Sequence, residues 1–202
     1  MSPQLLSPDF FLDAPDRVAQ RLLGKLLIRQ PDMAEDETTI GRIVETEAYF
    51  GTGDPAAHTY SGKTPRNAVL FGPPAVAYVY FIYGMYYCLN FSCEPDGVAG
   101  GVLLRALEPI AGLATMARRR GFPAQVSARL LTSGPGRLCR AMSITRDAHN
   151  GLAVTDSASV LTVADDGHTP AQIDATPRIG IQKAADRLLR FTVQGNVYVS
   201  KG

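Results

Sequence analysis

The chain has 202 residues, of which 46% are hydrophobic and 19% are charged, a balance typical of a globular domain with one sizeable core. No stretch approaches the roughly 18 uninterrupted apolar residues of a membrane span, and the N-terminus lacks the basic start and apolar run of a signal peptide, so we expect one cytoplasmic domain. The formal net charge of +1 does not by itself indicate a nucleic-acid partner.

The first part of the chain predicts a helix, two strands and a long loop. Asp13 precedes an apolar pattern of helical period that ends at Gly24, which indicates a helix with an N-terminal cap and a glycine stop. Residues 26–29 and 38–50 have the pattern of strands, with an acidic turn between them. Residues 51–72 are rich in Gly, Pro, Ser and Thr without a sustained period, so we expect an irregular loop of the kind that often carries function.

Aromatic strands and then helices follow. Two runs of β-branched and aromatic residues, 76–83 and 85–92, flank Gly84 and predict a β-hairpin, and an apolar strand follows at 101–109. The remainder alternates helical segments with short strands: helices are expected at 110–121, 125–131, 133–144 (with Ser133 as a candidate cap) and 178–190, and a strand pair at 190–194 and 196–200. Together, these helices and strands predict a single compact α+β domain over residues 1–202, with a mostly antiparallel β-sheet, surrounding helices and a protruding β-hairpin.

Several kinds of chemistry find no support in the sequence. Cys88, Cys93 and Cys139 form no CxxC pair and have no histidine at metal-ligand spacing, so we expect buried thiols rather than disulfides or a metal site. No GxSxG motif, P-loop or GxGxxG in a βαβ context is present. Activation of water by a carboxylate is the one hydrolytic mechanism for which the sequence shows suitable residues.

Two glutamates in the strand at 38–50 are candidates for this role. The side-chain period of a strand places Ile43, Glu45, Glu47 and Tyr49 on one face. This face could be an ordinary solvent-facing surface. Alternatively, a carboxylate near the strand end could be a general base, because a strand holds its side chains firmly and the loop beyond can open a pocket. His58, in that loop, is either a solvated side chain or part of the pocket.

The tyrosines raise a second hypothesis. Residues 77–90 hold five of the eight tyrosines. Core packing accounts for Tyr86 and Tyr87, but Tyr83 stands at the expected hairpin tip beside Gly84, where an aromatic side chain has little core to enter. Aromatic rings stack on nucleobases with about 1–3 kcal/mol per base in single-strand binders. The cluster therefore suits holding a base, or filling the space that a base leaves.

A set of motifs gives these residues a common context. In chain order they are GRIVETEAY (41–49), DPAAH, TPRN, YVYFIYGMYYCLN, VLLRALEP, SGPGRLC and RFTVQGNVYVS. Over about residues 22–200 they resemble the 3-methyladenine DNA glycosylases of the alkyladenine type, the methylpurine-DNA glycosylases. The resemblance implies a monofunctional base-excision-repair enzyme that flips a damaged purine out of duplex DNA and hydrolyses its N-glycosidic bond. Its implied substrates are 3-methyladenine, 7-methylguanine, hypoxanthine and ethenoadenine.

The resemblance also implies roles for residues of the strand and the loop. Glu47 matches the base that activates the attacking water, whereas Glu45 has no such role in the family and is expected to be structural. Tyr49 and Tyr80 match the aromatic walls between which the flipped base stacks. His58 matches the residue that closes the pocket against the base or its phosphate.

Residues of the hairpin and the next strand complete the expected site. Asn90 matches the asparagine that excludes normal guanine, and Tyr83 matches the tyrosine that inserts into the gap left by the flipped nucleotide. Leu103 belongs to the base pocket, and Arg105 is expected to contact the DNA backbone or to position the water. No metal or organic cofactor is implied. The basic residues expected to gather on one DNA-binding face are Arg66, Arg105, Arg118, Arg119, Arg120 and Arg137; for the three consecutive arginines a solvated helix end is the alternative.

Two other functions are compatible with parts of this pattern. A hydrolase of small purine nucleosides could use the same base, although a free nucleoside leaves no gap for Tyr83 to fill. A noncatalytic nucleic-acid-binding module is the other alternative, because the family fold resembles a tRNA-binding domain of methionyl-tRNA formyltransferase. The preferred interpretation is a monomer that binds double-stranded DNA containing damaged purines and has no membrane partner.

Overall fold

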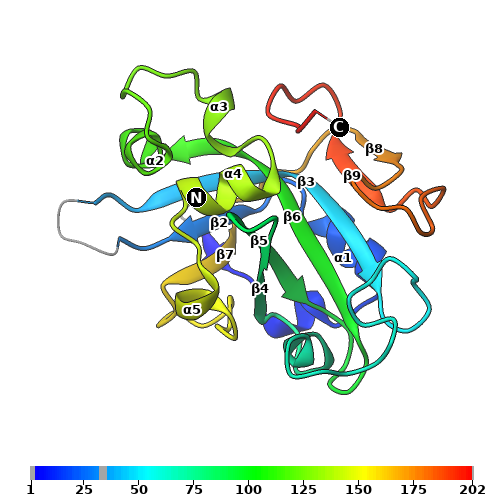
Figure 1. Ribbon diagram of the computed structural model, residues 1–202. Helices are drawn as coiled ribbons and strands as arrows, with labels where there is room; N and C mark the ends of the chain where they lie inside the picture. The colour runs from blue at the N-terminus through cyan, green and yellow to red at the C-terminus, as the bar shows by residue number, and fades with distance from the viewer. Residues whose placement is uncertain (1–2, 32–35, 202) are drawn as a thin grey trace.

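The computed structural model describes residues 3–31 and 36–201, and its strands form one antiparallel sheet (Figure 1). The strands run in the order β1-β7-β2-β3-β6-β5-β4, and β9 pairs with both β3 and β8. Their bounds are β1 Gln4–Leu5, β2 Leu26–Arg29, β3 Thr39–Phe50, β4 Ala77–Ile82, β5 Tyr86–Ser92, β6 Gly100–Ala111, β7 Leu161–Asp165, β8 Ile173–Thr176 and β9 Arg190–Val193. The expected α+β domain with an antiparallel sheet is confirmed.

Helices cover the sheet from two sides. Their bounds are η1 Pro8–Phe11, α1 Pro15–Leu22, η2 Ala68–Phe71, α2 Leu113–Arg120, α3 Arg129–Thr132, α4 Pro135–Ala141 and α5 Arg146–His149. Helix α1 packs against β3 and β6, whereas α4 packs against β5 and β6 and contacts α2 and α3. Because these elements share one cluster of buried apolar side chains, the long strands β3 and β6 are held from both sides. Within residues 3–31 and 36–201, no helix is long and apolar enough to cross a membrane.

Strand β3 pairs with β6 from Ile40 to Phe50, but the pairing is irregular in the middle. The register shifts between Ile43 and Glu45 and again between Glu45 and Thr46, whereas Glu47 lies opposite Leu103 in a regular stretch. Such bulges bend a strand and redirect its side chains. Glu45 and Glu47 are both fully buried, so the interpretation of this strand face as a solvent-facing surface is wrong.

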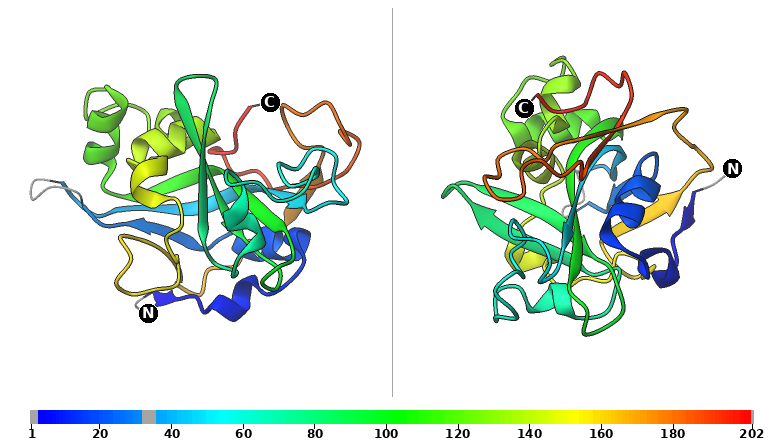
Figure 2. Two further views of the ribbon diagram at one scale, coloured as in Figure 1. Left: turned by 60° about the horizontal axis from the view of Figure 1, so that its bottom comes forward. Right: turned by 90° about the vertical axis from the view of Figure 1, so that its right-hand side faces the viewer.

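The hairpin of β4 and β5 extends from the body of the molecule, as both views of Figure 2 show. Its register runs from Ala77 opposite Phe91 to Ile82 opposite Tyr86. Tyr83 stands in the connecting turn with a φ of 53° and 77% of its surface exposed. A left-handed conformation is uncommon for a large side chain and costs conformational energy. The tip therefore presents an aromatic ring to solvent, as expected.

Four local expectations need correction. Asp13 is not the cap of α1, because Ala14 occupies that position and the Asp13 carboxylate accepts a bond from the Ala14 N–H at 2.8 Å. Ser133 does not cap α4 either, since its hydroxyl donates to the Tyr198 carbonyl at 2.6 Å. In the described chain, residues 178–189 contain no helix and 196–200 no strand. Strand β9 pairs with β8 and β3 instead, and the expected acidic turn at 31–37 lies partly outside the described residues.

Candidate active site

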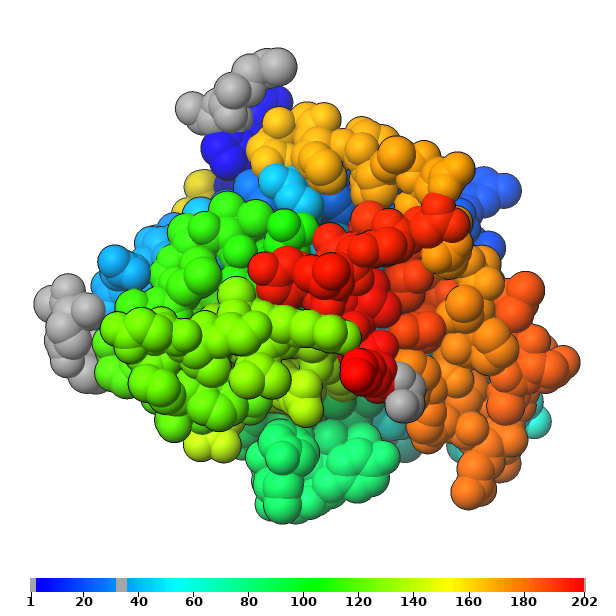
Figure 3. Space-filling view, turned by 90° about the horizontal axis from the view of Figure 1, so that it is seen from above, coloured from blue at the N-terminus to red at the C-terminus, as the bar shows by residue number. Residues whose placement is uncertain are grey.

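A cavity of about 830 Å³ opens where sequence-distant segments meet. Its walls come from the β4–β5 hairpin, the loop around His58, the start of α4, and two C-terminal segments, 179–181 and 199–201. In Figure 3 the teal hairpin projects from the surface beside the light-green helices and the red and orange C-terminal part of the chain. The volume lies within the range of pockets that enclose a small organic group.

The structure brings the residues proposed from the sequence into this one place. Seven of them line the cavity: Tyr49, His58, Tyr80, Tyr83, Asn90, Leu103 and Arg105. The eighth, Glu47, does not line it but lies directly behind the wall, joined to three lining residues by two hydrogen bonds and one ion pair. Strand pairing explains part of this gathering, because Asn90 lies opposite Leu103 and Tyr78 in adjacent strands.

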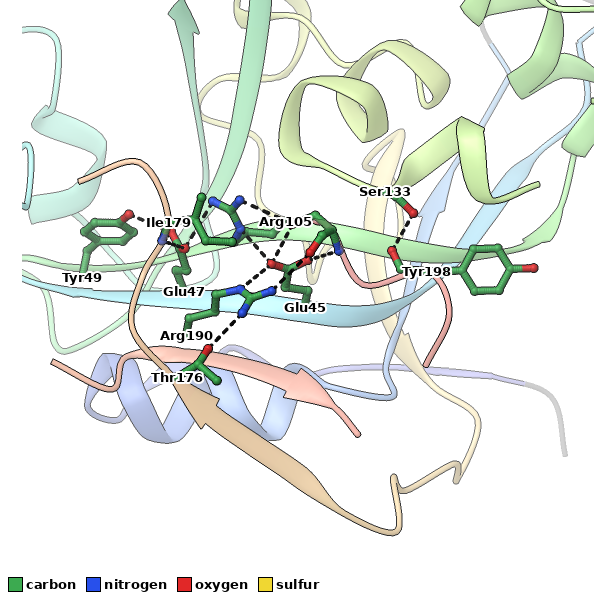
Figure 4. A network of polar contacts seen from close by, with 10 residues as sticks. Glu45, Glu47, Tyr49, Arg105, Ser133, Thr176, Ile179, Arg190 and Tyr198 are labelled. Carbon is green, nitrogen blue, oxygen red and sulfur yellow. Dashed lines mark hydrogen bonds and ion pairs between the residues drawn. The ribbon is translucent and has the colours of Figure 1, made fainter. Parts of the chain in front are cut away.

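The Glu47 carboxylate is held by three donors (Figure 4). Oε1 accepts the Ile179 N–H at 2.8 Å and lies 3.2 Å from an Arg105 guanidinium nitrogen, whereas Oε2 accepts the Tyr49 hydroxyl at 2.8 Å. Burial and the charge of Glu47 raise the pKa of Tyr49, so the phenol stays protonated and donates. A carboxylate has about four acceptor positions, so one position, on Oε2, is left without a protein donor within the described chain.

Aromatic rings form the opposite part of the cavity. The His58 ring packs edge-on against Tyr80, with centroids 4.5 Å apart, and its Nδ1 lies 3.2 Å from the Tyr78 hydroxyl. Partial desolvation and the nearby charge of Arg66 lower the pKa of His58 below its usual value, which favours the neutral imidazole at pH 7. Burial also raises the pKa of Tyr80. Rings that stay neutral suit an apolar stacking surface.

A buried ionic network supports Glu47 from behind. Glu45 accepts hydrogen bonds from Arg105 Nε at 2.9 Å, from Arg190 Nε at 2.7 Å and from both the N–H and the hydroxyl of Ser200, at 2.7 and 2.9 Å (Figure 4). Burial acts to lower the pKa of Arg105, but Glu47 and Glu45 outweigh it and the pKa is raised. Arg105 is therefore a fixed cation between the two carboxylates, and it ties the C-terminal tail to the site.

Basic side chains without acidic partners surround the cavity mouth. Arg129, Arg137 and Lys201 line it and form no ion pair within the described chain. Burial and the charges of Arg137 and Arg140 lower the pKa of Arg120, which marks a cluster of like charges. Several cations elsewhere are paired, for example Lys25 with Asp165, Arg42 with Asp166 and Arg17 with Asp13. Three cations without an acidic partner in the described chain therefore lie at the mouth, although the chain as a whole is nearly neutral.

This pattern revises the expected basic face. Arg66 lies 6.0 Å from the Tyr80 ring centroid, close to the cavity, and Arg137 lines it, as expected. Arg118 and Arg119 instead pair with Asp36. Arg105, at 7% exposure, is bound to Glu45 and Glu47 rather than presented to solvent. The sequence does not reveal these two ion pairs, because Asp36 is some 80 residues away from both arginines in the chain.

Sequence reasoning missed the C-terminal contribution. Ile179, Ser200 and Lys201 line the cavity, and Ile179 also binds Glu47 through its backbone. Backbone donors carry no side-chain signature, so residue type alone could not have identified Ile179. Arg178 was also overlooked, although it forms a buried ion pair with Asp54 of the DPAAH motif.

The three cysteines are free and buried, as expected. Cys88 lines the cavity beside Tyr80, and burial raises the pKa of its thiol. A protonated thiol is a poor nucleophile. Cys88 therefore contributes to the wall rather than to covalent chemistry.

Comparison with known proteins identifies the relatives of this chain. The family model described as Methylpurine-DNA glycosylase (MPG) matches residues 9–197. A protein of Koribacter versatilis is 54% identical over 192 residues, which cover 95% of this chain and 90% of the relative. A protein of Burkholderia lata is 48% identical over 98% of this chain and 92% of its own, and one of Chlorobaculum tepidum 43% identical over 97% and 90%. The names of all three assign them to the 3-methyladenine DNA glycosylases.

The match extends over nearly the whole chain and includes every segment that lines the cavity up to residue 197. This match favours a DNA glycosylase over the two alternatives, a nucleoside hydrolase and a noncatalytic nucleic-acid-binding module. The chain belongs to the methylpurine-DNA glycosylase family, DNA glycosylases that hydrolyse N-glycosyl bonds in base excision repair.

Proposed function

We propose that this glycosylase flips alkylated or deaminated purines out of duplex DNA and hydrolyses their N-glycosidic bond with a water activated by Glu47. The proposed substrates are 3-methyladenine, 7-methylguanine, hypoxanthine and ethenoadenine. The observation that carries the proposal is the Glu47 carboxylate, buried behind the cavity wall with three fixed donors and one acceptor position left on Oε2.

The free acceptor position determines the proposed chemistry. A water that donates one proton to Oε2 directs its lone pair away from the carboxylate. The water oxygen bonds to C1′ of the flipped nucleotide, the C1′–N bond breaks, and the purine leaves with that electron pair. The proton passes to Glu47. Arg105 and the Ile179 N–H hold the carboxylate on Oε1 meanwhile, so that Oε2 stays directed toward the water.

The aromatic walls account for the choice of a purine. A flipped base enters between Tyr49 on one side and Tyr80 with His58 on the other, while Asn90 and Leu103 shape the end of the pocket. Alkylated purines with a positively charged ring are good leaving groups, and aromatic faces attract such rings by cation–π interaction. In this proposal Asn90 excludes normal guanine by crowding its exocyclic amino group.

The hairpin tip accounts for flipping. Extruding a nucleotide costs a few kcal/mol of lost stacking and pairing. Tyr83, exposed at the tip and held in a left-handed turn, would fill the gap and restore stacking. The unpaired cations at the mouth, Arg129, Arg137 and Lys201, together with Arg66, would neutralise the phosphates that flank the flipped nucleotide.

We propose that the reaction stops at the abasic site. Cleavage of the backbone by a bifunctional glycosylase requires an amine that forms a Schiff base with C1′. Lys201 is the one lysine among the cavity-lining residues of the described chain, and it is exposed at the rim, whereas Glu47 supplies the site with a base for water. Reduction with borohydride should therefore trap no covalent complex between the enzyme and DNA.

The test is base release from duplexes that carry one hypoxanthine or one 7-methylguanine. Wild-type protein should produce abasic sites that become strand breaks only after alkali, and Glu47→Gln should bind the same duplexes without release. Glu108→Gln is the matched control, because Glu108 is partly buried on β6, accepts a bond from Asn196 and does not line the cavity. Base release by Glu47→Gln at the wild-type rate would rule out Glu47 as the base.

A further inference from the structure

A buried ion pair joins three segments around the cavity. The Arg178 guanidinium donates to both oxygens of Asp54, at 2.5 and 2.9 Å, and the two side chains are completely buried. The same guanidinium donates to the Ala48 carbonyl at 3.0 Å. Arg178 belongs to the C-terminal segment, Asp54 to the loop that carries His58, and Ala48 to β3, so one side chain connects regions more than 120 residues apart in sequence.

Arg178 also covers one face of the Tyr49 ring. Its guanidinium carbon lies 4.5 Å from the ring centroid. Tyr49 lines the cavity and Arg178 does not, so the guanidinium occupies the face directed away from the cavity. A cation above an aromatic face is attracted to the ring quadrupole. The contact fixes the tilt of the ring whose hydroxyl donates to Glu47.

The next residue, Ile179, donates its backbone N–H to the other Glu47 oxygen. Anchoring Arg178 therefore also anchors the neighbouring donor. Of the three donors that hold the Glu47 carboxylate, Arg178 supports two, the Tyr49 hydroxyl and the Ile179 N–H, and the third comes from Arg105.

Stability alone is a weak reason for such a pair. Buried ion pairs cost much desolvation free energy, and replacing them with well-packed hydrophobic residues of similar volume is often neutral or stabilising. Within the described chain the Arg178 Nε is buried without a hydrogen-bond partner, a further unfavourable term. This unfavourable ion pair lies next to the residues that bind Glu47, the carboxylate whose orientation decides the proposed reaction.

We infer that Arg178 and Asp54 are positioning residues of the active site, which hold the Tyr49 hydroxyl and the Ile179 N–H against Glu47 and link this geometry to the loop that carries His58. The inference rests on the proposed role of Glu47 as the base. Asp54 also accepts the N–H groups of Phe50 and Ala56, at 3.3 and 3.1 Å, and so transmits the anchoring to both ends of the loop's first turn.

The test replaces both charges together, because removing one partner leaves the other buried and unpaired. The variant Asp54→Asn/Arg178→Gln keeps hydrogen-bonding groups at both positions. The matched control is Arg42→Gln/Asp166→Asn, which makes the same chemical change in another two-bond pair, between Arg42 of β3 and Asp166, neither of which lines the cavity. The conservative variant Arg178→Lys keeps the charge but loses the planar fork.

Three quantities are measured on the full chain. These are the single-turnover rate of hypoxanthine excision at saturating enzyme, the affinity for a duplex with an abasic-site analogue, and hydrogen exchange of the Ile179 amide. We expect the Asp54→Asn/Arg178→Gln rate to fall about 100-fold, as for misplacement of a reacting group by about 1 Å, with DNA affinity unchanged and the Ile179 amide exchanging faster. The control pair should keep the wild-type rate, and Arg178→Lys should lie between.

A rate within about threefold of wild type in the folded double variant would overturn the inference, as would a rate loss matched by an equal loss of DNA affinity. If the double variant does not fold, Arg178→Lys must show the same separation of rate from affinity, and an unchanged rate overturns the inference. Glu47→Gln separates the two proposals. If Glu47→Gln is active, the assignment of Glu47 as the base fails. If Glu47→Gln is inactive while Asp54→Asn/Arg178→Gln and Arg178→Lys excise hypoxanthine normally, only the positioning role fails.

Discussion

Glu45 offers a sharp test of how the site is held together. The variant Glu45→Ala removes a fully buried carboxylate that accepts four hydrogen bonds, two of them from the guanidinium groups of Arg105 and Arg190. The two cations would then face each other in the protein interior without their shared counter-charge. Breaking a buried ion pair by removal of one partner costs about 3–5 kcal/mol.

This loss is a large fraction of the about 5–15 kcal/mol that stabilises a typical domain. For a chain of this size, about 2–4 °C of melting temperature correspond to each kcal/mol, so we expect the midpoint to fall by about 6–20 °C. Urea unfolding followed by circular dichroism gives the free energy directly from the shift in midpoint at constant slope. The tail at Ser200 should also become accessible to proteolysis, because it loses both of its bonds to Glu45.

Arg17→Ala is the comparison. It removes an ion pair in which the Arg17 side chain is 72% exposed, and such surface pairs contribute about 0–1 kcal/mol. If Glu45→Ala destabilises the fold by no more than Arg17→Ala does, the buried network adds nothing beyond a surface pair and the reasoning is refuted.

Three further predictions concern DNA and the pocket. Tyr83→Ala should slow excision from a fully paired duplex about tenfold or more but affect a lesion in single-stranded DNA little, because only the duplex leaves a gap; equal losses on both substrates would contradict the wedge role. Arg137→Ala should weaken binding to all sequences and lower the slope of log affinity against log salt by about 1, whereas Arg17→Ala should leave the slope unchanged. Arg66→Ala should raise the pKa of His58 by removing a nearby positive charge, measured by NMR titration of the ring; an unchanged pKa would show that partial desolvation alone lowers it.

The sequence by itself determined the parts of this protein that depend on local pattern. The hairpin around Tyr83, the long strand with Glu47, the apolar strand with Leu103 and the irregular loop with His58 all follow from apolar periodicity and from turn residues, and the structure has each of them. The ordered motifs also pointed to the family, because a series of short patterns in sequence order is far more specific than any one pattern.

Only the tertiary structure decided which groups are buried and what they bind. A strand pattern makes Glu45 and Glu47 equivalent, but Glu45 meets Arg190 and Ser200, while Glu47 meets Tyr49 and the Ile179 N–H. Within the segments expected to form a helix at 178–190 and a strand at 196–200, residues 178–189 and 196–200 are instead irregular, and residues 179–181, 199 and 200 line the cavity. The physical reason is that these segments gain their stability from buried ion pairs and backbone bonds to partners more than 90 residues away, and no local periodicity records such contacts.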